Sequence, residues 1–238
     1  MTANAADRCY TLDSRVYSRA ELRKLLVRPI DYPRSISFTL VRHAETSANT
    51  SGLAIGSVDV PLGSLGAIQA QECAGRVQSE YDLILTSELA RALTTVTIML
   101  ASGKLRAKYV VTDHRLNSRR LGVQEMQPIR VTPPESLGDF FYAPIGGESY
   151  EGVSIRVASL MISVASVICR TNITSILICS HLGILRVLAA MLSEEADPVA
   201  VVNMNLSHAD PLHFTSHRLT FPVFLRENCG PNLLPMHE

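Results

Sequence analysis

Apolar residues gather in short runs along this chain, and polar residues begin abruptly where several of these runs end. Residues 35–41 alternate small polar with apolar side chains, while 82–86 and 175–180 are almost continuously apolar. Runs of this length are typical of buried strands. Between them, apolar residues recur at helical spacing over 65–77 and over 149–169. Strands that alternate with helices in this way predict an α/β fold.

The remaining apolar runs complete the alternation of strands and helices. The pattern predicts helices over 87–99 and 184–192, a third strand over 108–112, and late strands near an edge over 212–215 and 219–225. Such a chain builds a mostly parallel sheet with both faces covered. We therefore expect a three-layer sandwich with a mostly parallel central sheet and helices on both faces.

The same pattern divides the chain into three parts. Residues 1–34 precede the first convincing strand and are interpreted as an N-terminal extension, 35–226 as the main domain and 227–238 as a C-terminal tail. Within the extension, 15–27 is predicted to form a short helix that packs on the body or on a partner subunit, so a homodimer is one arrangement that the sequence allows. Residues 121–147, rich in proline and glycine, are expected to form a long loop-like insert.

Composition and charge narrow the classes of function. Hydrophobic residues make up 47% of the 238 positions and charged residues 18%, as in a globular protein. The 22 basic and 22 acidic residues cancel. Because no global field then attracts nucleic acid or an anionic membrane, we expect neither as a partner. The N-terminus shows no secretory pattern, and the oiliest window, 160–168, is too short to span a bilayer.

The cysteines favour a reducing environment. The chain has 5 cysteines, and none is paired at the spacing of a metal site. Cys169 and Cys179 lie in apolar runs and are expected to be small core residues. We therefore expect a cytoplasmic location.

Three of the predicted strands lead into side chains that can bind an anion. Arg42 and His43 follow the first strand, His181 follows another, and Arg91 lies in the helix that opens after 82–86. In open α/β sheets, ligands bind at the carboxyl ends of the strands. Two imidazoles and two guanidinium groups are therefore expected at one edge of the sheet.

These residues lie within five motifs that occur in order along the chain. The motifs are "RHAETSAN" at 42–49, "VDVPLGSLGAIQA" at 58–70, "TSELARALTT" at 86–95, "GGES" at 146–149 and "SHLGILRVL" at 180–188. From about residue 36 to residue 206, the chain thereby resembles the histidine phosphatase superfamily, which includes the cofactor-dependent phosphoglycerate mutases. The resemblance implies a phosphoglycerate mutase-like fold.

The resemblance also implies roles for the side chains at the strand ends. His43 would be the nucleophile that accepts a phosphoryl group, and Arg42, Arg91 and His181 would complete the phosphate pocket. Guanidinium groups offer paired N–H donors to phosphate oxygens, and a neutral imidazole can form a phosphohistidine that water cleaves. His181, protonated beside the bound dianion, would act as a donor. No metal or cofactor is expected, and the substrate would be a small phosphorylated metabolite.

The sequence departs from the family pattern at two positions. Ala44 stands where the family has glycine, a mild change if the backbone there is not left-handed. Many members carry Leu-x-Glu-x-x-x-Gly, whose glutamate protonates the leaving oxygen. The matching stretch, 116–122, has Ser118 at the glutamate position. A serine hydroxyl cannot donate a proton at neutral pH as a carboxylic acid does, and general acid catalysis is worth roughly 10²–10⁴ in rate.

Three explanations of this serine are open. In the first, another acid near in sequence replaces the glutamate, and the candidates are Asp113, His114, Glu125 and Glu148. In the second, the substrate has a good leaving group, as a diphosphate, acyl phosphate or aryl phosphate does. In the third, the protein is a diverged member that binds a phosphorylated ligand, as a sensor or a subunit of an assembly, or runs non-hydrolytic chemistry.

Residues 119–147, which contain the insert, are expected to form part of the roof over the pocket. Arg119 and Arg120 either bind a second anionic group or are solvated, and 140–142 either anchor the loop or contact an apolar substrate body. The insert is short for a mutase, which favours hydrolysis. No Gly-x-Gly-x-x-Gly follows the first strand, which disfavours a dinucleotide-dependent oxidoreductase. The residues expected to bind substrate are Asn49, Ser118, Arg119, Glu148 and Ser149.

Overall fold

The central sheet has the predicted, mostly parallel architecture. The computed structural model describes residues 12–13, 15–25, 28–133, 139–193 and 197–221. In this part of the chain, the sheet has the strand order β4-β3-β6-β1-β7. β7 is antiparallel to its neighbour β1, and the other pairs are parallel. The strands are β1 (Ile30–Arg42), β3 (Glu80–Thr86), β4 (Arg106–Thr112), β6 (Ser175–Ser180) and β7 (Pro211–Leu219).

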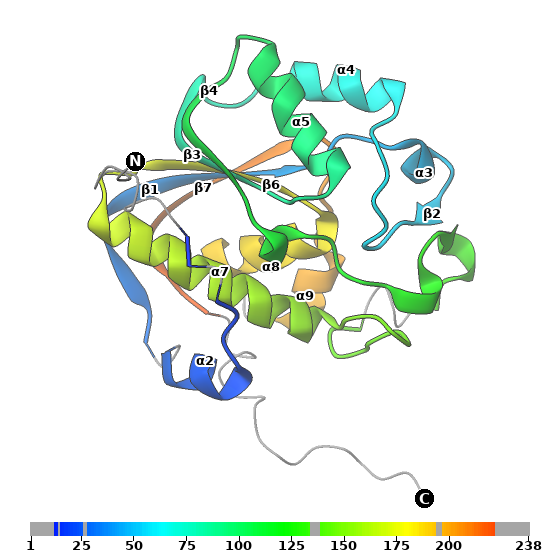
Figure 1. The fold of residues 1–238 in the computed structure, drawn as a ribbon. Helices are drawn as coiled ribbons and strands as arrows, with labels where there is room; N and C mark the ends of the chain where they lie inside the picture. The colour runs from blue at the N-terminus through cyan, green and yellow to red at the C-terminus, as the bar shows by residue number, and fades with distance from the viewer. Residues whose placement is uncertain (1–11, 14, 26–27, 134–138, 194–196, 222–238) are drawn as a thin grey trace, which may run out of the picture.

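Two pairs of helices cover the two faces of this sheet, as Figure 1 shows. α4 (Ser64–Cys73) and α5 (Ala90–Ala101) pack together on one face, where α5 contacts β3 and β6. α7 (Tyr150–Arg170) and α8 (Leu182–Ser193) pack together on the other face, against β1. The prediction of a three-layer α/β sandwich is therefore confirmed.

The alternation of side chains along the central strands builds a separate hydrophobic core on each face. In β1, Leu40 belongs to the core under α7 and α8, and the next residue, Val41, to the core under α4 and α5. In β6, Ile178 and Cys179 divide in the same way. Successive side chains of a strand point to opposite faces, so a strand that is covered on both faces must be apolar throughout.

Shorter elements lie around the sheet and at its carboxyl edge. The insert is more structured than the predicted loop, because β5 (Gln127–Pro128) pairs antiparallel with β2 (Leu53–Ala54). The other short elements are α2 (Arg19–Leu25), α3 (Ser47–Thr50), α9 (Pro198–Asn203) and the 3-10 turns η1 (His114–Leu116), η2 (Gly122–Gln124) and η3 (Ile129–Val131).

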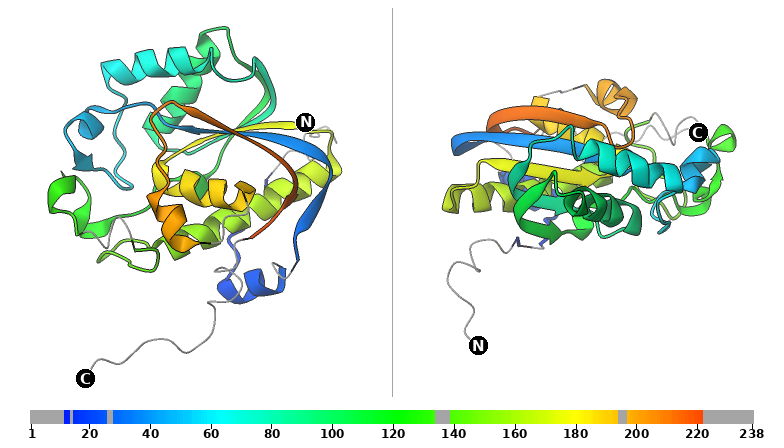
Figure 2. Two further views of the ribbon diagram at one scale, coloured as in Figure 1. Left: turned by 180° about the vertical axis from the view of Figure 1, so that it is seen from behind. Right: turned by 90° about the horizontal axis from the view of Figure 1, so that it is seen from above.

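The late strands were predicted wrongly as two segments. A single strand, β7, pairs with β1 from Val41↔Pro211 to Ile30↔Leu219, and Figure 2 shows the two strands side by side. The polar residues 216–218 interrupt the apolar pattern, which led to the prediction of two strands. Because β7 is an edge strand, these residues can be exposed or half-buried within it. Residues 222–225 lie outside the described part of the chain.

Several boundaries also differ from the predicted ones. β1 begins at Ile30 rather than at residue 35, and its pairing with β7 shifts register between Asp31 and Ile36. The predicted helix 15–27 is helical over Arg19–Leu25, and residues 26–27 lie outside the description. The helix predicted from residue 87 begins at Ala90. A domain boundary near residue 34 and a tail from residue 227 stay predictions.

The longest helix, α7, is apolar because it is a core helix. By length and composition alone it could span a membrane, but 67% of its most apolar window is buried inside the protein. Cys169, in the last turn of this helix, is exposed, so the expectation that it is a core residue is wrong. Cys179 is buried as expected.

Candidate active site

Strand pairing brings the two predicted catalytic histidines together. Arg42, the last residue of β1, lies opposite Ser180, the last residue of β6. The next residues, His43 and His181, therefore leave neighbouring parallel strands at the same edge. The His43 backbone N–H donates to the Ser180 carbonyl at 2.8 Å, and the two imidazole ring centroids are 5.0 Å apart. Both side chains are buried.

Arg91 reaches the same edge from the first turn of α5. Its guanidinium donates from Nη1 to the Val58 carbonyl at 2.8 Å and from Nη2 to the Gly56 carbonyl at 2.9 Å. These bonds fix the direction of a side chain that is 1% exposed. Burial lowers the pKa of Arg91 to about 10, so the group stays positively charged at neutral pH.

The hydrogen bond of His43 determines which ring nitrogen can react. Nδ1 lies 2.8 Å from the backbone carbonyl of Ala44. A carbonyl oxygen only accepts, so the proton of the neutral ring is on Nδ1 and Nε2 carries the lone pair. Burial, and then the charge of Arg91, lower the pKa of His43 well below its ordinary value. His43 is therefore a neutral imidazole with a nucleophilic Nε2 at neutral pH.

His181 has the opposite tautomer. Its Nε2 lies 2.9 Å from the Ser87 hydroxyl, which donates its own proton to Asn117 Oδ1 at 2.8 Å. His181 Nε2 is then the donor and Nδ1 the unprotonated nitrogen. Burial, and then the neighbouring His43, lower the pKa of His181 well below its ordinary value. An anion bound near Nδ1 would oppose this shift, and the protonated ring would then donate from Nδ1.

Arg42 adds a second guanidinium group to the site. Its Nη1 donates to the Leu206 carbonyl at 2.9 Å, and burial lowers its pKa to about 10. Three buried nitrogens of the site, Arg42 Nε, Arg91 Nε and His181 Nδ1, have no hydrogen-bond partner among the described residues. Buried polar groups are rarely left unpaired, so these atoms point to a ligand that accepts hydrogen bonds.

The alanine that replaces the family's glycine fits without strain. In the described part of the chain, the non-glycine residues with positive φ are Met126 and Ala209, so Ala44 is not left-handed. Ala44 is fully buried, and its N–H donates to Thr95 Oγ1 at 3.0 Å. The expected mildness of this change is therefore confirmed.

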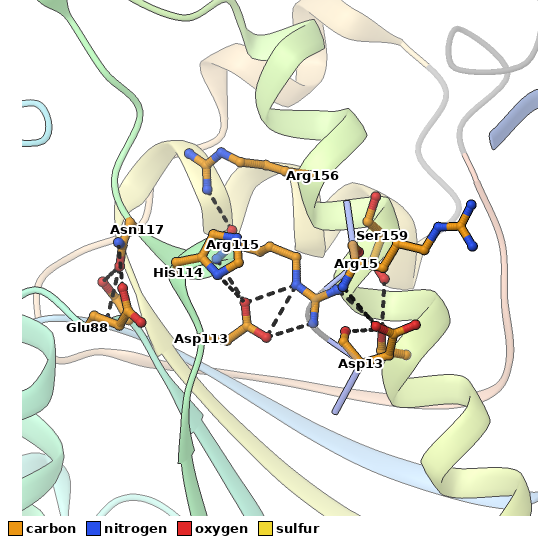
Figure 3. A network of polar contacts seen from close by, with 11 residues as sticks. Asp13, Arg15, Glu88, Asp113, His114, Arg115, Asn117, Arg156 and Ser159 are labelled. Atoms are coloured by element: carbon orange, nitrogen blue, oxygen red, sulfur yellow. Dashed lines mark hydrogen bonds and ion pairs between the residues drawn. The ribbon is translucent and has the colours of Figure 1, made fainter. Parts of the chain in front are cut away.

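Two of the four candidate acids lie in the segment after β4, which Figure 3 shows. The Asp113 carboxylate accepts from Arg115 Nη2 at 2.7 Å and from Arg115 Nε at 3.0 and 3.2 Å. Arg115 is fully buried and also donates to the backbone carbonyl of Arg15 at 3.0 Å. Asp113 is thus held in a buried ion pair, whereas the His114 side chain is 50% exposed.

The other two candidate acids differ in their contacts. Glu148 forms a bidentate ion pair with Arg156, which donates from Nε to Oε1 at 2.9 Å and from Nη2 to Oε2 at 3.0 Å. Glu125 Oε1 accepts from the Ser57 backbone and hydroxyl at 2.8 and 2.7 Å. The charges of Asp59 and then Glu125 raise the pKa of Arg91 against the larger effect of burial. Of the four candidates, Glu125 is therefore the one whose charge acts on Arg91.

The predicted substrate-binding residues make local contacts. Asn49 Oδ1 accepts from Thr46 in the capping box of α3, and the Ser149 hydroxyl caps α7 by accepting from Gly152 N at 3.1 Å. Arg119 is 5% exposed and lies over the Tyr150 ring, 4.5 Å from its centroid. Ser118 is half-buried, and its carbonyl accepts from Arg156. Substrate binding by Asn49, Ser118, Arg119, Glu148 and Ser149 stays a prediction.

The structure places a third histidine, His208, in the site, and the sequence did not predict it. The His208 ring centroid lies 5.1 Å from that of His43, on a loop that enters β7. The predicted anion-binding residues all follow a strand of the parallel sheet, whereas His208 precedes the antiparallel strand β7. The isolated histidine in "NLSHADP" was the available signal.

Comparison with known proteins defines the class to which this fold and site belong. A model of the histidine phosphatase superfamily (branch 1) matches residues 38–219. The chain therefore belongs to this superfamily, as its sequence motifs predicted.

Individual relatives are phosphatases and mutases. The chain is 32% identical to an adenosylcobalamin/alpha-ribazole phosphatase of Escherichia coli, over 64% of this chain and 77% of the relative. It is 32% identical to phosphoglycerate mutase-like protein 4 of Arabidopsis thaliana, over 72% and 74%. A crystal structure of the alpha-ribazole phosphatase from Shigella flexneri superposes with a TM-score of 0.63 at 26% identity, over 78% and 96%. These relatives support a phosphoryl-transfer activity.

Proposed function

We propose that this protein is a metal-independent phosphatase that hydrolyses a small phosphorylated or diphosphorylated metabolite through a phosphohistidine on His43. The observation that carries the proposal is the state of His43. Its Nδ1–H is held by the Ala44 carbonyl, its pKa is lowered by burial, and Arg42 and Arg91 lie around it. A buried neutral imidazole beside two guanidinium groups has the properties of a phosphoryl acceptor.

The first step is attack of His43 Nε2 on phosphorus. The N–P bond forms as the bond from phosphorus to the leaving oxygen breaks. Arg42 and Arg91 stabilise the charge on the equatorial oxygens, and such donors are typically worth 10²–10³ in rate each. His181, protonated when the dianion binds, donates a hydrogen bond from Nδ1 to a phosphoryl oxygen. In the second step, water attacks phosphorus as the N–P bond breaks, both protons of the water stay on the released inorganic phosphate, and the neutral His43 returns.

The leaving group decides which substrates react fast. Asp113 and Glu148 are each held by an arginine, and a paired carboxylate is a poor proton donor at neutral pH. With Ser118 at the position of the family's acid, the proposal favours substrates that leave without strong protonation, such as diphosphates, acyl phosphates and aryl phosphates. If a substitute acid acts, Glu125 and His114 are the candidates that no ion pair with an arginine holds among the described residues.

An alternative function is a diverged member that binds a phosphorylated ligand without hydrolysing it. Ser118 favours this alternative, because without a proton donor the same donors hold a phosphate ester without cleaving it. The two functions share the anion site and differ in turnover. A comparison of turnover between the wild type and a variant without His43 therefore separates them.

The test is a panel of alkyl, aryl and acyl phosphates and diphosphates, run with the wild type, His43→Ala and the exposed control His217→Ala. We expect aryl phosphate hydrolysis that falls roughly 10⁴-fold or more in His43→Ala and is unchanged in His217→Ala. Rapid quenching should trap acid-labile phosphate on His43. Equal, negligible turnover in all three proteins, with retained phosphate binding, would establish the alternative.

A further inference from the structure

His208 contacts the proposed nucleophile although it lies outside the motifs that carry the family resemblance. The rings of His43 and His208 are 5.1 Å apart between centroids and tilted by 58°. His208 Nδ1 lies 2.9 Å from the backbone carbonyl oxygen of His43. A carbonyl accepts, so His208 is the donor, and its Nδ1 carries a proton in either charge state.

This hydrogen bond completes the support of one peptide group, the one between His43 and Ala44. Its carbonyl oxygen accepts from His208, and its N–H donates to Thr95 Oγ1 at 3.0 Å. Neither bond belongs to the sheet, because β1 ends at Arg42. Rotation of this peptide plane would change the backbone angles of both residues and move the Ala44 carbonyl, which holds the Nδ1–H of His43.

The loop before β7 is built so that His208 turns back toward β1. Ala209 is left-handed, with φ 49°, and its N–H donates to the Arg42 carbonyl at 2.9 Å. The Leu206 carbonyl of the same loop accepts from the Arg42 guanidinium. A left-handed backbone at a residue other than glycine is costly and persists where surrounding contacts require it. The loop thus holds Arg42 and His43 together.

We propose that His208 is a positioning residue for the phosphoryl transfer, which rests on the proposed function. Through Nδ1–H it fixes the peptide group after His43, so that the Ala44 carbonyl keeps the proton of His43 on Nδ1. The lone pair on Nε2 is thereby kept available for attack on phosphorus. Arg42 and Glu45 are the charged groups that act on His208, and the proposed role needs no change in its charge.

Two substitutions separate this role from proton transfer by His208. Asparagine carries an N–H donor at about the position of Nδ1, whereas glutamine carries one near Nε2. We expect His208→Asn to keep kcat within about 3-fold and His208→Gln to lower kcat roughly 10- to 100-fold with little change in KM, because misplacing a reacting group by about 1 Å costs up to 10²-fold. The exposed His217, changed to Asn and to Gln, is the matched control.

A measurement without turnover keeps the inference separate from the proposed activity. In the ¹⁵N spectrum of the ligand-free protein, His43 should be the Nδ1–H tautomer in the wild type and in His208→Asn. In His208→Gln it should lose this single state. If His208→Gln retains both the tautomer and kcat, or retains more kcat than His208→Asn, the positioning role is wrong. If the tautomer responds as expected while the wild type and every variant are inactive, the proposed phosphatase function fails instead.

Discussion

The two ends of the central sheet differ in whether their buried charged side chains are paired with groups of opposite charge. At the amino-terminal end, the Asp82 side chain of β3 is 11% exposed, and Lys108 Nζ lies 2.6 Å from its carboxylate. The backbone N–H groups of Thr174 and Ser175 also donate to it, at 2.8 and 3.1 Å. Burial alone would raise the pKa of Asp82, but Lys108 and these hydrogen bonds outweigh it and lower the pKa to about 2.

At the carboxyl-terminal end, positive charge is buried without such pairing. Among the described residues, no ion pair joins Arg42 or Arg91 to a carboxylate. Burial lowers the pKa of both guanidinium groups and of His43 and His181. One end of the sheet is therefore arranged to stabilise the fold. The other end holds unneutralised donors whose charge an anion can compensate.

Among substitutions that compare the two ends of the sheet, the largest effect is expected from Arg91→Lys, at the carboxyl end. Lysine cannot hold the Gly56 and Val58 carbonyls and also offer a flat pair of donors to phosphate. We expect kcat/KM for an aryl phosphate to fall roughly 10²–10³-fold. The exposed Arg106, changed to lysine at the opposite end of the sheet, is the control. Equal activity in the two variants would show that Arg91 does not contact the phosphoryl group.

A stability effect without an activity effect is expected from Asp82→Asn, at the amino end. The pKa of Asp82 is depressed from 3.8 to about 2, so its charge stabilises the fold by about 2 kcal/mol above pH ~4. This contribution is lost as the pH falls from about 4 toward 2. Urea unfolding should show Asp82→Asn less stable at pH ~7 and the difference shrinking below pH ~4. A constant difference across this range would contradict the assignment, and kcat should be unchanged.

A smaller and selective effect is expected from Ser118→Glu. If the missing acid limits turnover, the new carboxyl should raise hydrolysis of an alkyl phosphate by roughly 10-fold and leave p-nitrophenyl phosphate nearly unchanged, because only the alkoxide needs a proton. Ser118→Gln has the same size without the acid and serves as control. Equal changes on both substrates, or equal effects of Glu and Gln, would show that proton donation at this position is not limiting.

Much of the fold and part of the site followed from local patterns. The apolar runs at 82–86 and 175–180 predicted β3 and β6 with at most two residues of error. The family motifs identified His43 and His181, and strand pairing places them side by side. The predictions of element ends and of burial were wrong where the position of an element in the fold outweighs its local hydrophobic pattern. Polar residues at 216–218 belong to an edge strand, and Cys169 is exposed in the last turn of a mostly buried helix.

The sequence by itself determined the alternating strands and helices and the family, and it supplied the candidate site residues Arg42, His43, Arg91 and His181. These features depend on residue type and on spacing along one segment, which can be read locally. Only the tertiary structure decided the tautomer of His43, the pairing of Asp113 and Glu148, and the contact of His208 with His43, which joins positions 165 residues apart. Such contacts depend on strand register and loop conformation, because these bring distant side chains within hydrogen-bond distance.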